Sequence, residues 1–78
     1  MNNHRRQALQ GVRDSLAGIR GDLEPIRDEE AEYRDNIPEN LQGSTRAELA
    51  DEAVDALDNA LGALDEAMEH IGIAMGEE

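Results

Sequence analysis

The fold is decided by residues 50–75, which read ADEAVDALDNALGALDEAMEHIGIAM. Apolar residues recur there at alternating spacings of four and three, the heptad period of a helix with one apolar stripe. The stripe consists of Ala50, Val54, Leu57, Leu61, Leu64, Met68, Ile71 and Met75. Beside it, alanine recurs every seven residues at Ala53, Ala60, Ala67 and Ala74, and such small side chains let a neighbouring helix approach closely. Ser44 or Thr45 is a suitable N-cap, and Glu48 would complete a capping box with Thr45. We therefore predict a helix over about residues 45–75.

A second heptad pattern precedes it and predicts a helix over about residues 5–36. Its apolar members are Leu9, Val12, Leu16, Ile19, Leu23, Ile26, Tyr33 and Ile37, with Glu30 at the one position that interrupts them. Proline lacks an amide donor and crowds the preceding turn, so we expect a kink or short break between Gly21 and Pro25. The register does not slip there, which favours a bent continuous helix or two collinear segments. Residues 37–44 contain Pro38 and Gly43 and are predicted to form a loop.

Charged residues predict how the two helices pair. Facing residues in an antiparallel pair have a constant sum of residue numbers, and the sum is 85 for Arg34 with Asp51, Arg27 with Asp58 and Arg20 with Asp65. It is 87 for the apolar layers Tyr33 with Val54, Ile26 with Leu61, Leu23 with Leu64 and Ile19 with Met68. Both patterns predict a single all-α domain over residues 1–78, an antiparallel two-helix hairpin of coiled-coil type. A hairpin this small is only marginally stable, so a four-helix bundle formed by a homodimer stays open as an alternative.

Composition excludes several classes of site. The chain has 78 residues and no cysteine, so it forms neither a disulfide nor a thiolate metal site. Ser15, Ser44 and Thr45 lack a spaced histidine base, and there is no glycine-rich phosphate loop, so we expect no enzyme and no cofactor. His70 has only Glu66 and Glu69 nearby, and we expect no metal site. No apolar run reaches the ~20 residues of a membrane span and no signal-type segment opens the chain, which predicts a cytoplasmic protein without membrane contact.

Two further residues call for local interpretation. Glu30 lies in the apolar stripe, and we expect Arg27 and Arg34 to neutralise it from its own helix. Leu41 lies in the loop, where it either folds back over Ile37 and Leu49 or is offered to a partner. Folding back is favoured because it would close the end of the core.

Acidic residues suggest the kind of partner. The net charge is -12, and residues 47–78 contain no basic residue. Such a chain disfavours direct binding to nucleic acid or anionic membrane and favours a protein with a basic surface. The candidate partner-binding face along ~30 Å of the second helix consists of Asp51, Glu52, Asp55, Asp58, Asp65, Glu66 and Glu69. One hypothesis is that this face imitates a row of phosphates, whereas composition alone favours a merely solubilising face. Salt adaptation is a further alternative, because all basic residues are arginine.

Residues 26–44 read IRDEEAEYRDNIPENLQGS. Together with the alanine-rich acidic heptads, they resemble a group of small acidic proteins encoded by phages, prophages and other mobile elements. The resemblance covers roughly residues 22–71, and its specific part is the turn from Tyr33 to Ser44; Pro25 and the glycine-containing N-terminal segment depart from the group's pattern. It implies a mobile-element setting. With the charge, it leads us to expect a non-catalytic modulator or inhibitor of a host nucleic-acid-handling or defence complex. The alternative is a structural helical oligomerisation element without nucleic-acid mimicry.

Overall fold

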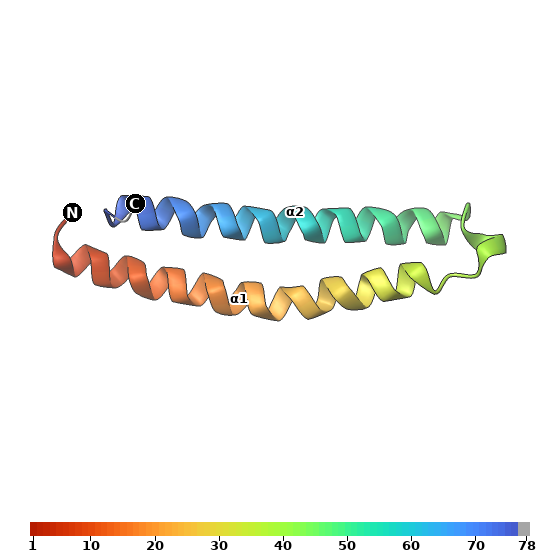
Figure 1. The fold of residues 1–78 in the computed structure, drawn as a ribbon, viewed down its shortest axis with the longest axis horizontal. Helices are drawn as coiled ribbons and strands as arrows, with labels where there is room; N and C mark the ends of the chain where they lie inside the picture. The colour runs from red at the N-terminus through yellow and green to blue at the C-terminus, as the bar shows by residue number, and fades with distance from the viewer. Residues whose placement is uncertain (77–78) are drawn as a thin grey trace.

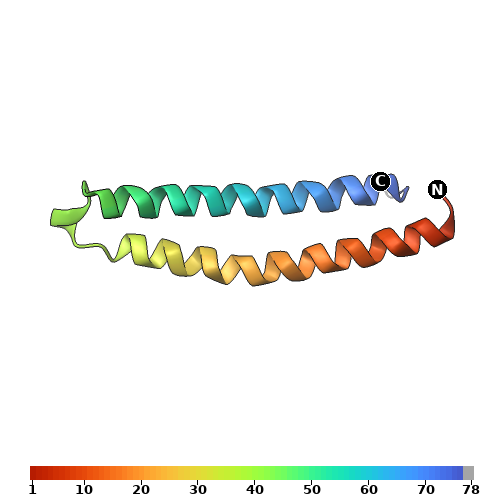
Figure 2. The same ribbon diagram turned by 180° about the vertical axis from the view of Figure 1, so that it is seen from behind.

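Two long antiparallel helices make up the molecule. The structure, a computed structural model, describes residues 1–76. Helix α1 spans Asn3–Asp35, the 3-10 turn η1 spans Glu39–Leu41, and helix α2 spans Thr45–Ala74. Figure 1 shows the two rods side by side with both chain ends at one end of the molecule, and Figure 2 shows the same pairing from behind. The predicted all-α hairpin is confirmed, and the described residues contain no strand.

Helix α1 is continuous through the expected point of weakness. The Asn2 side chain caps it by accepting a hydrogen bond from the backbone N–H of Arg5 at 2.8 Å. Pro25 lies inside the helix, and no break occurs between Gly21 and Pro25. The helix is bowed instead, with its middle farthest from α2 (Figure 1). Surface helices usually curve with the convex side toward water, and the missing donor of Pro25 is tolerated within that curve.

The turn between the helices is held by the N-cap of α2 and by a small buried cluster. Ser44 is the N-cap of α2, and its hydroxyl accepts from the backbone N–H of Ala47 at 3.3 Å. Ile37, Ala47 and Ala50 form a buried cluster beneath the turn. Leu41 and Leu49 stay exposed, so the end of the core is closed by Ile37 and not by Leu41 folding over Leu49.

Helix α1 faces α2 with a different side from the one predicted. The side chains of Val12, Ile19, Ile26 and Tyr33 are between 47% and 55% exposed. The predicted layers that place Ile19, Ile26 and Tyr33 in the core are therefore wrong. The residues that α1 turns toward α2 are the half-buried leucines and, four residues after each, half-buried arginines: Leu9, Leu16, Leu23, Arg13, Arg20 and Arg27.

Arginine explains this rotation of α1. Its aliphatic stem covers apolar surface while the guanidinium reaches past it to a carboxylate, so an arginine can occupy the flank of a helix seam. On the other flank, the alanines of α2 offer little surface for Ile19 and Ile26 to bury. The core is consequently narrow. Its buried apolar residues are Ala31, Ile37, Ala47, Ala50, Val54 and Leu61.

The ends of the hairpin are also joined. The Arg6 Nε donates a hydrogen bond to the Met75 carbonyl oxygen at 3.0 Å. Met75 is the C-cap of α2, where carbonyl groups lack partners within the helix and a cation is favourable. Gly76 follows with φ 89°, the left-handed conformation that commonly ends a helix. No helix in the described part of the chain combines the length and apolarity of a membrane span.

Candidate functional site

Three arginine–aspartate pairs cross between the helices, and we call them the ion ladder. Arg27 Nε lies 2.6 Å from Asp58 Oδ1, and Arg20 Nε lies 2.6 Å from Asp65 Oδ1. In both pairs the Nη2 atom also donates to the second carboxylate oxygen, at 3.4 and 3.3 Å respectively. Arg34 Nε lies 3.6 Å from Asp51 Oδ1, a longer contact. The structure thus brings together all three pairs of the predicted register.

The ladder also shifts the pKa values of Arg20, Arg27 and Asp58. The hydrogen bond from Arg27 holds the pKa of the Asp58 carboxyl below its usual value of 3.8, against a smaller opposing effect of desolvation. The hydrogen bond that Arg27 donates to Asp58 raises the pKa of Arg27, and the one that Arg20 donates to Asp65 raises the pKa of Arg20. Arg27 and Asp58 are thus both stabilised in their charged forms, so this bidentate pair stays ionised across the neutral pH range.

The ladder uses part of the candidate partner-binding face. Asp51, Asp58 and Asp65 are the α2 members of the ladder, so their charges are balanced by arginine. Each arginine also contacts an acid on its own helix: Arg20 binds Glu24, Arg27 binds Asp28 and Arg34 binds Asp35. These three aspartates hold the hairpin in register, and a partner would have to compete with α1 for them.

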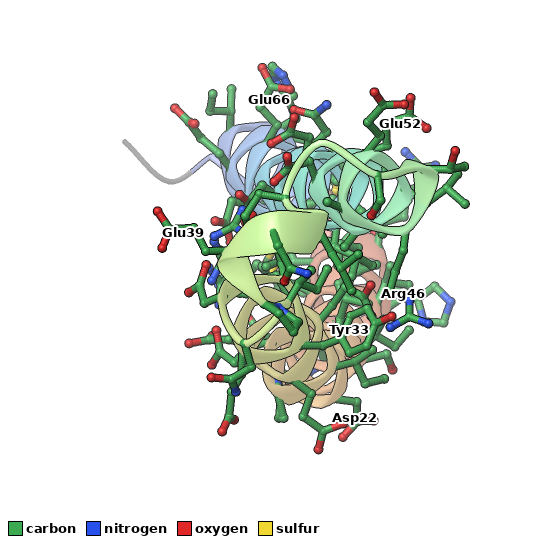
Figure 3. All side chains as sticks on the ribbon, turned by 90° about the vertical axis from the view of Figure 1, so that its right-hand side faces the viewer. Asp22, Tyr33, Glu39, Arg46, Glu52 and Glu66 are labelled. Carbon is green, nitrogen blue, oxygen red and sulfur yellow. The ribbon has the colours of Figure 1, made fainter. Side chains whose placement is uncertain are left out.

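The other four residues of that face point outward. Glu52, Asp55, Glu66 and Glu69 are exposed, and within residues 1–76 none of them forms an ion pair. Figure 3, seen from the turn end, shows Glu52 and Glu66 on the side of α2 away from α1. Glu48 belongs with them because it is exposed and lies seven residues before Asp55, on the same side of the helix. We call these five residues the outer acidic face.

The sequence pattern alone does not assign Glu48 to this face, because its spacing to Thr45 suggests a capping role. Its seven-residue spacing to Asp55 was the signal that could have assigned it to this face. With Glu48 included, the face consists of two groups, one around Glu52 and one around Glu66. Asp55 and Glu66 are eleven residues apart, about 16 Å along the axis at the usual helical rise. Uncharged Asn59 and Gly62 lie between them.

Glu30 does not have the partners expected for it. It is half-buried, but Arg27 and Arg34 direct their hydrogen bonds to Asp58, Asp28 and Asp35. The prediction that these arginines neutralise Glu30 on its own helix is wrong, because both turn their Nε atoms to aspartates instead.

His70 is exposed near the end of α2. Among residues 1–76, no group of three or more histidine, aspartate or glutamate side chains is placed to hold a metal ion.

Comparisons with protein-family models, with curated proteins and with solved structures find no match to this chain. The main feature of the surface is a division of α2 into a carboxylate side and an alanine side.

Proposed function

We propose that the protein is a non-catalytic binding module whose outer acidic face captures a protein with a basic surface. The partner class that fits best is a nucleic-acid-handling or defence protein of the host of a mobile element. The protein would act as a modulator or inhibitor by occupying the groove that otherwise receives phosphates. It would bind neither nucleic acid nor membrane directly.

One observation carries this proposal: the unpaired carboxylates of α2 all lie on one side of a rigid helix. Asp51, Asp58 and Asp65 are held by arginine, whereas the five residues of the outer acidic face form no ion pair within residues 1–76. A solubilising charge would serve equally well if scattered around the helix. One flank of α2 instead carries alanines at Ala53, Ala56, Ala60, Ala63 and Ala67, between the outer acidic face and the side that packs on α1.

The chemistry of phosphate recognition supports the choice of partner. Arginine and lysine side chains that hold phosphates also hold carboxylates, with bidentate hydrogen bonds in the case of arginine. The two acidic groups are fixed by the helix, so their binding requires little further ordering of the chain. Complementary charge also speeds the encounter of the two proteins at low salt.

Affinity capture with a charge-reversed variant tests the proposal. The test variant is Asp55→Lys/Glu66→Lys/Glu69→Lys, which leaves the ion ladder intact. The control is Asp22→Lys/Glu29→Lys/Glu32→Lys, which makes the same change of net charge on α1. Proteins retained by the wild-type chain and the α1 variant, but not by the α2 variant, are the expected partners. Double-stranded DNA should release them, since it competes for the same groove.

Two results would contradict the proposal. One is equal capture by the α1 and α2 variants, which would show that only net charge matters. The other is capture that double-stranded DNA leaves unchanged, which would remove the mimicry of phosphates. Circular dichroism of both variants should show unchanged helicity, because none of the six residues is buried.

The alternative function, a structural oligomerisation element without mimicry, also has an observation in its favour. Val12, Ile19, Ile26 and Tyr33 leave about half of their surface in water. The two functions do not exclude each other, because these residues belong to α1 and the outer acidic face belongs to α2.

A further inference from the structure

One long edge of the hairpin is apolar on both helices. Figure 3 shows Tyr33 of α1 and Arg46 of α2 on the same side of the molecule. In a heptad pattern, residues seven apart lie on the same side of a helix. The residues at seven-residue intervals before Tyr33 and after Arg46 therefore form two rows along this side of the molecule. The α1 row is Val12, Ile19, Ile26 and Tyr33, and the α2 row is Ala53, Ala60, Ala67 and Ala74. We call these eight residues the apolar edge.

The opposite edge is closed by the ion ladder. Arg27 with Asp58, and Arg20 with Asp65, span the seam there. The hairpin therefore has one sealed edge and one open edge. The open edge leaves Ile19 at 53% and Ile26 at 55% exposure, although both side chains follow the heptad spacing of a core.

Helix α2 presents a second seam along the apolar edge. The seam alternates in steps of four and three, like the first, but is built almost wholly from alanine. Its members are Ala53, Ala56, Ala60, Ala63, Ala67, His70 and Ala74. None of these positions carries a carboxylate, in a chain with 19 acidic residues. An alanine seam of this kind suits the close approach of another helix, and on α2 it leaves no carboxylate to be desolvated.

A single hairpin also buries little apolar surface. Among the described residues, Val54 is the largest side chain that is fully buried. Small domains that lack disulfides and metals commonly obtain the missing burial by oligomerisation. A row of four large, half-exposed apolar residues is the kind of patch that marks an interaction surface.

We propose that a second copy of this chain covers the apolar edge, related by a two-fold axis parallel to the helices. The ion ladder fixes which residues of α1 and α2 lie at the same height along the hairpin axis. At equal levels lie Val12 and Ala74, Ile19 and Ala67, Ile26 and Ala60, and Tyr33 and Ala53, each pair with the sum 86. The axis exchanges the positions of α1 and α2, so each large side chain meets an alanine of the partner. Facing large and small residues pack without gaps, and adjacent helices in the resulting four-helix bundle all run antiparallel.

The dimensions of the hairpin are sufficient for such an interface. Its extents of 59 Å and 16 Å define a rectangle of about 940 Å². A stable interface buries about 800 Å² on each partner. Because a two-fold interface uses the same surface on both copies, a single apolar edge supplies both halves of the contact.

The outer acidic face is not required for this interface, but acids border it. In Figure 3, Asp22 and Glu52 lie on the same side of the molecule as Tyr33, below and above it. Pairing two chains of charge -12 brings such residues together at the rim. Added salt screens this repulsion, so the dimer should strengthen as salt rises, whereas capture of a basic partner should weaken.

Sedimentation equilibrium of the full chain tests the proposal. The wild type is expected to be a dimer at micromolar concentration, and Ile26→Gln a monomer of unchanged helicity. Ile73→Gln is the matched control, because Ile73 is also an isoleucine, is 60% exposed and lies off the edge. Tyr33 is the only aromatic residue, so a change in its fluorescence on dilution should follow dissociation. A wild type that stays monomeric up to millimolar concentration overturns the proposal, as does equal dissociation by the two variants.

Cross-linking tests the orientation. The chain has no cysteine, so single-cysteine variants can be mixed in pairs without background. An axis parallel to the helices predicts a disulfide between Ile26→Cys and Ala60→Cys chains. An axis perpendicular to the helices would instead place Ile19→Cys against Ile26→Cys, and preferential cross-linking of that pair would overturn the proposed arrangement. Neither outcome depends on a basic partner, so this test can fail while the proposed function stands.

Discussion

Arg27 of α1 and Asp58 of α2 meet through two hydrogen bonds, from Nε to Oδ1 at 2.6 Å and from Nη2 to Oδ2 at 3.4 Å. The pair is 31 residues apart in sequence and lies on the surface. Exposed ion pairs contribute little to stability, so its main effect is to select one alignment of the helices over others. Arg20 with Asp65 repeats the same geometry two helical turns away.

Reversing one charge of this pair should disturb the hairpin, and exchanging both should repair it. Asp58→Arg places a third cation beside Arg27 and Arg34, and we expect the Tm to fall by several degrees through like-charge repulsion. In the double variant Arg27→Asp/Asp58→Arg, the attraction returns with opposite polarity and most of the loss should be recovered. Thermal unfolding followed by circular dichroism measures both. A double variant no more stable than the single one would show that the pair does not act as a unit.

The contribution of Asp58 should depend on pH in a defined direction. Its pKa is lowered in the folded chain by the hydrogen bond from Arg27, so the folded state favours the ionised form. The stability that this provides is fully present above the usual carboxyl pKa of 3.8 and is lost as the pH falls through the lower folded-state value. The difference in Tm between wild type and Asp58→Asn should therefore shrink toward zero in acid.

The control for this pH series is Asp55→Asn, which removes the same charge on the same helix without removing a ladder contact. Any general relief of charge repulsion appears in both variants and cancels in the comparison. If the two variants change in parallel down to strongly acidic pH, Asp58 has no special link to Arg27.

Two leucines of α2 differ strongly in how far their side chains are buried. Leu61 is 8% exposed, whereas Leu49 is 59% exposed. We expect Leu61→Ala to lower the free energy of unfolding by about 2 to 5 kcal/mol, through lost burial and the cavity left behind. Leu49→Ala should change it by less than about 0.5 kcal/mol. Urea unfolding at one fixed chain concentration compares them, and equal losses would mean that α2 faces α1 with another side.

The middle of α1 should tolerate, and gain from, better helix formers. Pro25 is exposed inside a continuous helix and cannot donate to the carbonyl of residue 21. Pro25→Ala restores that donor and should raise the free energy of unfolding by up to about 3 kcal/mol. Gly18→Ala should raise it by about 1 kcal/mol, because a Cβ at Gly18 would meet no atom within 4 Å. Thermal unfolding measures both, and a loss of stability in Pro25→Ala would show that the bow of α1 is needed for packing.

Much of this fold follows from spacing alone. The heptads of α2 predict its buried side, with Val54 and Leu61 in the core, and Ser44 predicts where the helix starts. The arginines and aspartates predict the register because both recur every seven residues. Such periodic signals are strong because each is repeated several times along the chain.

The rotation of α1 could not be predicted in the same way. Its apolar stripe has two rows, one that contains Leu16 and Leu23 and one that contains Ile19 and Ile26. The heptad pattern does not say which of the two rows packs on α2 and which stays in water. The outcome depends on how far the arginine stems at Arg20 and Arg27 cover the seam, which is a property of side-chain packing. The same competition decides Glu30, since Arg27 and Arg34 turn to aspartates on α2 and on α1 itself.

The hydrogen bond from Arg6 to the Met75 carbonyl places the two ends of the described chain against each other, opposite the turn. A short peptide joining them would allow new termini to be opened near Asn40 in η1, producing a circular permutant. Such a chain would contain both helices without the original turn. If it kept the alignment of Arg27 with Asp58, side-chain pairing alone would be sufficient to specify how the rods meet.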